Sequence, residues 1–368
     1  MRNICILVGA RPNFIKVAPL IRAIRSNSSI NYRLVFAGSP DDPTVEDSLF
    51  SDLQMPPPDT FLGVNSNSLN VITSQVMERF DAWLSQWPAD IVVVVDDLAS
   101  TMAAAITAKK RGLCLAHLVA GTRSFDKRMP KEVNRLVIDA LSDYLFTAGV
   151  RSTGIASRQQ DTTAELAPAN GTPGTYMVGN ILMDNLRFIR QRLTPPTNLI
   201  DRTTPLVPGS YMVLTLNRKA LLTDAPHLEQ LLNAIISSAN EVPVIAPLRV
   251  QAASVVQGLN LKTPGLQLFP PLPYLQFGWL TAHAKGIITD SGNVAEEATF
   301  NGVPCITLNS YTEHQERVTL GTNVLVGEDP EQLSHYTELM VAGKWKPSTL
   351  PDRWDGHTAE RVLKIIAP

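Results

Sequence analysis

Continuous apolar runs of strand length recur along this chain of 368 residues, and segments with helical spacing separate them. The runs lack the polar alternation of a half-exposed strand, so we expect both of their faces to be buried. Such strands, when helices join them, form open, doubly wound parallel sheets, and the pattern therefore predicts an α/β protein. The predicted strands are residues 4–8, 32–37, 91–95, 113–118 and 144–147 in the first half, and 211–216, 243–246, 266–269, 286–289 and 305–308 in the second half.

The two sets of strands are separated by residues 191–210, which are rich in Pro, Thr and Gly and have little apolar periodicity. This composition is typical of a linker between domains. The chain also exceeds the length at which one hydrophobic core usually keeps growing. We therefore expect two Rossmann-like doubly wound domains with a cleft between them, the first over residues 1–190 and the second over residues 191–352.

Charge and cysteine content exclude several classes of protein. The chain has 32 basic and 34 acidic residues and a net charge of −2, so no overall field attracts nucleic acid or an anionic membrane. The three cysteines lie inside apolar runs and the six histidines are scattered, so no metal site is predicted. Buried free thiols, no signal peptide and no spanning stretch together indicate a cytoplasmic protein without a membrane span.

The first predicted strand runs into a helix through the octet G-A-R-P-N-F-I-K at residues 9–16. At such a junction the backbone amides and the positive end of the helix dipole favour an anion. Arg11 and Lys16 add positive charge at this junction, which is therefore a candidate phosphate site. The alternative is an ordinary strand–helix turn with a solvated arginine and lysine.

Asp96 and Asp97 end the strongest predicted strand, residues 91–95. Ligands of open α/β sheets bind just beyond the carboxyl ends of the strands. Asp97 is therefore a candidate site residue, and the alternative is that it caps the helix that follows.

Glu132 and Arg135 lie three residues apart at the start of a predicted helix. Glu132 is a candidate general acid or base, because partial removal of a carboxyl group from water raises its pKa toward neutrality. Arg135 can orient that carboxylate or contact phosphate. The alternative is a capping glutamate in a surface ion pair.

The stretch D-S-G-N-V-A-E-E-A at residues 290–298 follows a predicted strand and opens a helix. Ser291 and Gly292 are small enough for the backbone to approach a diphosphate, whose charge meets exposed N–H groups at the helix start. Asn293 enters left-handed conformations more easily than most residues. This stretch therefore predicts a phosphate-binding site at the helix start, and Glu297 lies further along the same helix.

These motifs resemble, in order and with similar spacing along nearly the whole chain, the signatures of the non-hydrolysing UDP-N-acetylglucosamine 2-epimerase family. Residues 117–123 and 130–135 read H-L-V-A-G-T-R and P-K-E-V-N-R and resemble the family's H-[VM]-E-A-G-x-R and P-[EK]-E-x-N-R. Residues 9–16 resemble G-[TA]-R-P-x-x-I-K. Residues 290–298 resemble D-S-G-G-[IV]-Q-E-E-A, and residues 312–323 resemble T-E-R-P-E followed by G-T-N.

The resemblance implies a glycosyltransferase B-type fold, a last helix within residues 353–368 that packs back on the first domain, and a homodimer. It implies a UDP-sugar as partner, UDP-N-acetylglucosamine or a related compound, and no cofactor. The first domain would act on the sugar and the second would hold UDP. The resemblance and the motifs together assign Asp97, Glu132, Arg135 and Asp126 to catalysis, and Arg11, Lys16, His117, Arg249, Phe277, Ser291, Gly292, Asn293, Glu297, His314 and Arg317 to substrate and UDP binding.

The chain departs from the family pattern at positions that matter for the reaction. Val119 stands where the family has a glutamate, and Asp96 stands where it has a glycine before Asp97. Asn217 replaces a histidine, and His314 replaces an arginine. Valine cannot transfer a proton and asparagine cannot titrate, so another group must supply the proton transfers of C2 epimerisation.

Three functions fit these features. The first is an epimerase-like enzyme that acts at C2 of a UDP-amino sugar with an altered active site, in which Glu132 and Asp97 form the acid/base pair, or Asp126 has taken over. The second is a glycosyltransferase that uses the same UDP-sugar cleft. The third is a catalytically impaired UDP-sugar-binding protein.

Overall fold

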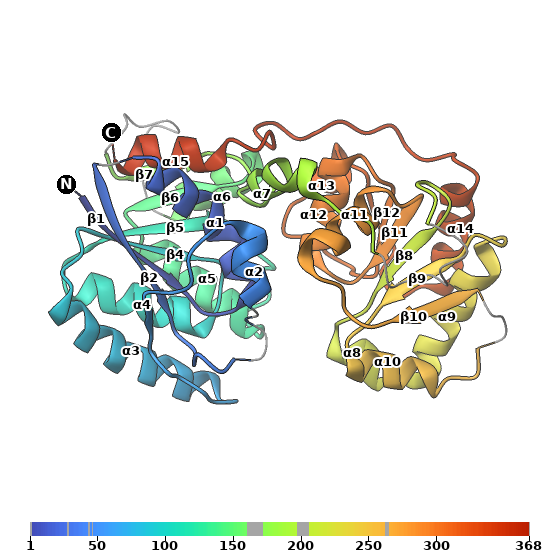
Figure 1. Ribbon diagram of the computed structural model, residues 1–368, viewed down its shortest axis with the longest axis horizontal. Helices are drawn as coiled ribbons and strands as arrows, with labels where there is room; N and C mark the ends of the chain where they lie inside the picture. The colour runs from blue at the N-terminus through green and yellow to red at the C-terminus, as the bar shows by residue number, and fades with distance from the viewer. Residues whose placement is uncertain are drawn as a thin grey trace. The chain divides into compact units, whose positions relative to one another are not determined.

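The computed structural model describes residues 2–27, 29–42, 45, 47–159, 172–196, 206–261 and 265–367. The chain divides into two compact units (Figure 1). The first comprises Met1–Phe188 with Asp352–Pro368, and the second comprises Ile189–Pro351. Each unit contains one parallel sheet with helices packed on it, which confirms the predicted α/β class with two doubly wound domains.

The sheet of the first unit has the strand order β3-β2-β1-β4-β5-β6-β7, with every pair parallel. The order reverses between β1 and β4, which creates a topological switch point at their carboxyl ends. The strands are β1 (Arg2–Val8), β2 (Ile30–Phe36), β3 (Thr60–Phe61), β4 (Ile91–Val95), β5 (Cys114–Ala120), β6 (Tyr144–Thr147) and β7 (Gly174–Met177), and the helices are α1 (Arg11–Arg25), α2 (Asp47–Leu53), α3 (Leu69–Gln86), α4 (Ala99–Lys110), α5 (Pro130–Leu141), α6 (Val150–Gln159), α7 (Leu182–Ile189) and α15 (Thr358–Ile366).

Helices cover both faces of this sheet. On one face, apolar residues of α3, α4 and α5 share a core with alternate strand residues such as Leu7, Val92 and Val94. The intervening residues of the same strands point to the other face, where α1 and α15 pack against each other (Figure 1). Helices α1 and α5 therefore lie on opposite sides of the end of β4.

The last helix, α15, packs back on the first unit. The Asp184 carboxylate, at the start of α7, accepts hydrogen bonds from the backbone N–H groups of Thr358 (3.1 Å) and Ala359 (2.8 Å). It therefore caps α15 from a distant part of the chain. The segment before α15 is anchored by Trp354, a fully buried side chain whose Nε1 donates to the carbonyl oxygen of Ala148 at 3.0 Å.

The second unit repeats the plan with the parallel strand order β10-β9-β8-β11-β12-β13. Its switch point lies between β8 and β11. A short 3-10 helix, Arg190–Arg192, precedes the sheet. The strands are β8 (Met212–Thr215), β9 (Val244–Pro247), β10 (Leu266–Phe269), β11 (Gly286–Thr289), β12 (Cys305–Thr307) and β13 (Asn323–Leu325), and the helices are α8 (Lys219–Thr223), α9 (Ala225–Ser238), α10 (Val250–Gln257), α11 (Tyr274–Ala282), α12 (Gly292–Asn301), α13 (Glu316–Thr319) and α14 (Pro330–Val341).

Every predicted apolar run is a strand in the structure, with ends that differ by at most two residues. The sequence did not reveal β3, β7 or β13, which are short or mixed in polarity and lie at sheet edges. Residues 197–205 of the predicted linker lie outside the described residues.

Of the helices in the described part of the chain, none has the length and apolar character that crossing a bilayer requires. The described ranges also contain no group of three or more His, Cys, Asp or Glu side chains arranged to hold a metal ion.

Candidate functional site at the carboxyl ends of the strands

The octet after β1 opens helix α1 at the switch point of the first unit. Gly9 is required there because a Cβ atom would overlap the hydroxyl group of Ser100 on α4. Ala10 precedes the helix and has no side chain that could cap it. Arg11 is half-exposed at the first helical position, and the structure records no ion pair for it among the described residues. Its charge and the helix start offer a site for an anion.

Lys16, one helical turn further on, is buried against an acidic partner. Its Nζ lies 2.6 Å from Oδ1 of Asp96, while Nδ2 of Asn13 donates to Oδ2 of Asp96 at 3.0 Å. The Asn13 side chain also accepts a hydrogen bond from the Gly9 N–H (2.9 Å). Asp96 thus ties the end of β4 to the first turns of α1.

Asp97 turns toward α5 instead. Its Oδ2 lies 2.5 Å from Nη2 of Arg135 and accepts from Nε of the same guanidinium at 2.8 Å, and its Oδ1 lies 3.6 Å from Nζ of Lys131. Burial raises the pKa of this carboxyl group, but Lys131 and Arg135 outweigh burial and hold the pKa below its ordinary value. Asp97 is therefore a carboxylate at neutral pH.

The Glu132 carboxylate holds the loop between β5 and α5. Oε2 accepts from the backbone N–H (2.8 Å) and the hydroxyl (3.0 Å) of Ser124, and Oε1 accepts from the N–H of Phe125 (3.2 Å). Arg135 Nη1 lies 3.5 Å from Oε2. Arg135 thus links Glu132 to Asp97, and most of the hydrogen-bonding capacity of Glu132 is used within the protein.

Asp126, in the same loop, pairs with a neighbour at the surface. Its two oxygens lie 2.8 Å from Nε and Nη2 of Arg128. These hydrogen bonds lower the pKa of Asp126 to about 2.

His117 lies in the interior, 1% exposed, with both ring nitrogens bonded to protein atoms. Nε2 lies 2.9 Å from the carbonyl oxygen of Asp96, which can only accept, so Nε2 carries a hydrogen. Nδ1 lies 2.5 Å from Oδ1 of Asp139 on α5. The second oxygen of Asp139, Oδ2, lies 2.6 Å from Nη2 of Arg123 and accepts a hydrogen bond from the Gly121 N–H (3.0 Å). This buried network supports the backbone of the site.

Sequence reasoning missed Asp139, although the pattern contained a signal. Glu132, Arg135 and Asp139 follow the spacing of one helical face, and all three are buried. A polar stripe on the buried face of an amphipathic helix indicates an internal network. Burial raises the pKa of Asp139, but His117 and Arg123 outweigh burial and hold the pKa below its ordinary value.

Val119, near the end of β5, has a left-handed backbone, φ +72°. The pairing of β5 with β6 shifts register between Leu118 and Ala120, so Val119 lies in a bulge. A β-branched residue in this region of φ is rare and strained. Asp96, on the neighbouring strand, is also left-handed (φ +59°). Two adjacent strand ends therefore carry unusual backbone conformations, which cluster at functional sites.

In the second unit, Ser291 and Gly292 open α12 after β11. The Ser291 N–H donates to Oγ1 of Thr289 (2.9 Å), and its own side chain does not cap the helix. A Cβ atom at Gly292 would lie 3.9 Å from the Arg317 guanidinium and near nothing else. Asn293 is half-exposed in the first turn. This helix start is open to an anionic group.

The loop after β8 is hydrogen-bonded to Asp290, the residue directly before the Ser291–Gly292 turn. The Asp290 carboxylate accepts from the backbone N–H groups of Asn217 and Arg218, both at 2.6 Å. The Asn217 side chain is exposed.

Glu297, His314 and Arg317 are buried around α12. His314 Nε2 lies 3.7 Å from Oε1 of Glu296, and Nη1 of Arg317 donates to the carbonyl oxygen of Gly292 at 2.8 Å. Arg317 therefore holds the backbone of the Ser291–Gly292 turn.

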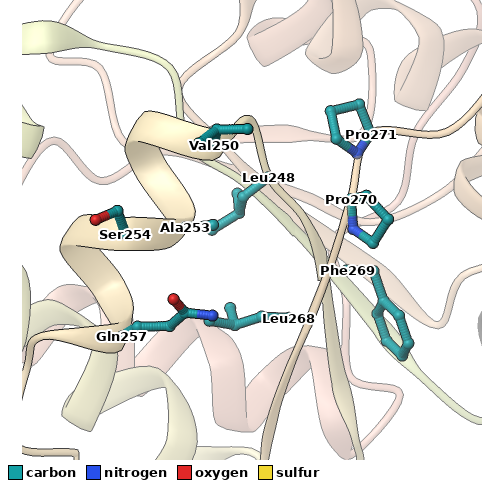
Figure 2. Close-up of a pocket in the computed structure, with 9 residues that line it drawn as sticks. All are labelled: Leu248, Val250, Ala253, Ser254, Gln257, Leu268, Phe269, Pro270 and Pro271. Carbon is teal, nitrogen blue, oxygen red and sulfur yellow. The ribbon is translucent and has the colours of Figure 1, made fainter.

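Arg249 and Phe277 lie near the other strand ends of this unit. Phe277 is half-buried and packs against the apolar core, and Arg249 is exposed at the start of α10. Beside Arg249 lies an apolar cavity of about 350 Å³. Figure 2 shows α10 on one side of it and the end of β10 with the following loop on the other. The lining residues are Leu248, Val250, Ala253, Ser254, Gln257, Leu268, Phe269, Pro270 and Pro271.

Comparison with known proteins agrees with this architecture. The model of the UDP-N-acetylglucosamine 2-epimerase family matches residues 22–367. A UDP-2,3-diacetamido-2,3-dideoxy-D-glucuronate 2-epimerase of Pseudomonas aeruginosa is 33% identical over 327 residues, 88% of each chain. A UDP-N-acetylglucosamine 2-epimerase homolog of Methanococcus maripaludis is 31% identical over 378 residues, 99% of each chain.

Solved structures of UDP-GlcNAc 2-epimerases also match this chain. The Methanocaldococcus jannaschii UDP-GlcNAc 2-epimerase in complex with UDP-GlcNAc and UDP matches with a TM-score of 0.81 and 28% identity, covering 98% of this chain and 99% of that one. The fold is therefore of the glycosyltransferase B type that these epimerases share. The chain belongs to the UDP-N-acetylglucosamine 2-epimerase family.

Proposed function

We propose that this protein epimerises a UDP-activated amino sugar at C2. One observation of the site carries the proposal: two consecutive carboxylates at the end of β4 each meet cations, Asp96 with Lys16 and Asp97 with Arg135 and Lys131. These groups stand at the topological switch point, where open α/β sheets bind ligands. Family membership supplies the reaction class, and the cluster supplies charged groups able to move protons and to attract phosphate.

The reaction needs two proton transfers. A base removes the proton from C2, the electron pair of the C2–H bond forms a double bond between C1 and C2, and UDP leaves with the electron pair of the C1–O bond. UDP then adds back at C1 while a proton reaches the opposite face of C2. Each positioned proton-transfer group contributes about 10²- to 10⁴-fold in rate. We assign the first transfer to Asp97, whose carboxylate is ionised at neutral pH and is held in place by Lys131 and Arg135.

We assign the binding of UDP to the second unit and of the sugar to the first. The backbone amides of Gly292 and Asn293 and the hydroxyl group of Ser291 would receive the diphosphate, and Glu297 would receive the ribose. Arg11 would offer its charge to the departing nucleotide. Arg135, Glu132 and Asp126 would support catalysis. His117, Glu132 and Arg317 would act indirectly, through the backbone to which they are hydrogen-bonded. The further residues assigned to UDP or substrate binding are Lys16, His117, Arg249, Phe277, His314 and Arg317.

A second candidate function is binding of a UDP-sugar, or its use in glycosyl transfer, without epimerisation. Val119 and Asn217 favour it, because neither side chain can transfer a proton where the family pattern has glutamate and histidine. Transfer to an acceptor replaces the C1–O bond to UDP and leaves the C2–H bond intact, and binding breaks no bond, so neither needs proton abstraction at C2.

The deciding experiment is incubation with UDP-N-acetylglucosamine in deuterium oxide, with C2 and free UDP followed by proton NMR. UDP-2,3-diacetamido-2,3-dideoxy-D-glucuronate, the sugar named for one relative, is the second substrate to test. Deuterium at C2 together with the C2 epimer supports epimerisation. UDP binding with no exchange on either substrate refutes epimerisation of these sugars. UDP release that requires an added acceptor supports a transferase.

UDP binding is tested separately with Gly292→Ala. The added methyl group meets open space and leaves the fold intact, but it obstructs close approach of a diphosphate. We expect the Kd for UDP to rise about tenfold, which corresponds to about 1.4 kcal/mol. Gly258→Ala, at a helix end with ordinary backbone angles, is the matched control and should leave the Kd unchanged. Equal affinity in the two variants would refute the assignment of this turn.

We further propose a homodimer in the cytoplasm. The homodimer rests on the family resemblance, and sedimentation equilibrium tests it. The three cysteines are free, and burial raises the pKa of Cys114 to about 11 and that of Cys305 to about 12. Unpaired, unreactive thiols suit a reducing compartment. Localisation of a tagged full-length chain tests this assignment.

A further inference from the structure

We infer that Asp96 is a second proton-transfer residue of the site and works from the side of the β4 end opposite to Asp97. The inference rests on the proposed C2 epimerisation and names a group that can replace the missing glutamate. Asp96 is a carboxylate that the family pattern lacks, so family membership does not assign it a role.

Two consecutive residues diverge from one strand end. The Asp96 carboxylate contacts Lys16 and Asn13 of α1, whereas the Asp97 carboxylate contacts Arg135 and Lys131 of α5. Helices α1 and α5 cover opposite faces of the sheet (Figure 1). The switch point therefore presents one carboxylate from each side. Inversion at C2 requires one group on each face of the sugar carbon, and this arrangement supplies both.

Asp96 is held in a left-handed backbone conformation. Its φ of +59° is uncommon for a residue other than glycine. The conformation persists because the Asp96 N–H donates to the carbonyl oxygen of Leu118 (3.3 Å) and its carbonyl oxygen accepts from Nε2 of His117 (2.9 Å). His117 is itself fixed by Asp139. A strained residue that its surroundings over-determine is a feature of active sites.

Asp96 and Val119 are neighbours across two strands. Asp96 bonds to Leu118, and Val119 follows Leu118 directly, with the other left-handed backbone of this edge. Relative to the family pattern, the chain loses a carboxylate at position 119 and gains one at position 96. A carboxylate is thus retained at this edge of the sheet but comes from the adjacent strand.

Lys16 completes the proton balance. In one direction, Asp97 takes the C2 proton, and the Lys16–Asp96 pair, joined at 2.6 Å, returns a proton to the opposite face through the carboxyl group of Asp96. Asp97 then holds one proton more and the pair one proton fewer, and exchange with water restores both. In the reverse direction the Asp96 carboxylate takes the proton and Asp97 delivers it.

The test uses Asp96→Asn in the full-length protein, with deuterium wash-in at C2 measured from each epimer separately. Asparagine keeps the size of the side chain and tolerates the left-handed backbone. We expect interconversion of the epimers to fall about 100-fold or more, while one epimer still exchanges its C2 proton through Asp97. A purely structural role would not produce exchange in one epimer without inversion. Undiminished interconversion, or equal loss of exchange from both epimers, would overturn the inference.

Relocation of the carboxylate gives an independent readout. We expect D96G to lose inversion and D96G/V119E to regain it, because the carboxylate returns to the neighbouring strand. D96G/V119G, which relieves the backbone at both positions without adding a carboxylate, is the matched control and should stay inactive. Failure of V119E to rescue, in a variant with wild-type Tm and UDP affinity, overturns the inference. If the wild-type protein exchanges no deuterium from either substrate, the proposed function fails and the inference with it.

Discussion

The buried network around Asp139 makes the sharpest prediction about stability. Asp139 is 0% exposed and receives Nδ1 of His117 at 2.5 Å, Nη2 of Arg123 at 2.6 Å and the N–H of Gly121 at 3.0 Å. Asp139→Asn removes the charge and turns an NH₂ group toward one of these donors. Arg123, 6% exposed, then keeps a buried charge without its carboxylate. Breaking a buried pair in this way costs about 3–5 kcal/mol.

The measurement is urea unfolding of the full-length chain at pH 7, with amide hydrogen exchange of β5 used to assign the transition of the first unit. Asp143→Asn is the control in the same unit. Asp143 pairs with Lys109 at 2.8 Å, but the two side chains are 27% and 30% exposed, so we expect a loss of about 1 kcal/mol or less.

A double-mutant cycle separates the pair from its surroundings. Arg123→Met alone leaves the Asp139 charge with fewer partners, so the double variant should lose less than the sum of the single losses, by about 2 kcal/mol. If Asp139→Asn costs less than about 1 kcal/mol and the β5 amides stay protected, the reasoning about this network is wrong.

Three further predictions concern the same unit. Gly121→Ala should cost about 3 kcal/mol in urea unfolding, because φ is +74° and a Cβ atom would overlap the carbonyl oxygen of Ser152; an unchanged midpoint would contradict this. Asp184→Ala removes the cap of α15, so the free energy of unfolding should fall by about 1–2 kcal/mol. The α15 amides should then exchange faster than those of α4. Unchanged exchange of the α15 amides would refute the capping role. The pKa of Asp139 is lower in the folded than in the unfolded protein, so this group contributes stability above the unfolded pKa of about 3.9, and the contribution is lost as pH falls through the folded pKa. Asp139→Asn should therefore lose less stability than the wild type below about pH 5. Identical pH profiles for the two proteins would contradict this prediction.

The positions of the motif residues were predictable in outline because these residues follow strand ends. Arg11, Asp97 and the Ser291–Gly292 turn all lie just beyond the carboxyl ends of strands, as the pattern predicted. The bonding of the side chains was not predictable. The Glu132 carboxylate turns back to the loop at Ser124, which depends on how that loop folds. Lys16 of α1 meets Asp96, which lies 80 residues further along the chain, so this contact depends on the pairing of β1 with β4.

By itself, the sequence determined the two doubly wound domains and the family. Continuous apolar runs are buried on both faces when they form parallel strands that helices cover on both sides. It also placed the motif residues along one edge of each sheet, since the carboxyl ends of parallel strands share one side of a sheet. Only the tertiary structure decided that Asp96 and Asp97 face different helices and that His117 is bonded inside the protein. Those outcomes depend on left-handed backbones at Asp96 and Val119, which contacts between strands impose against local preference.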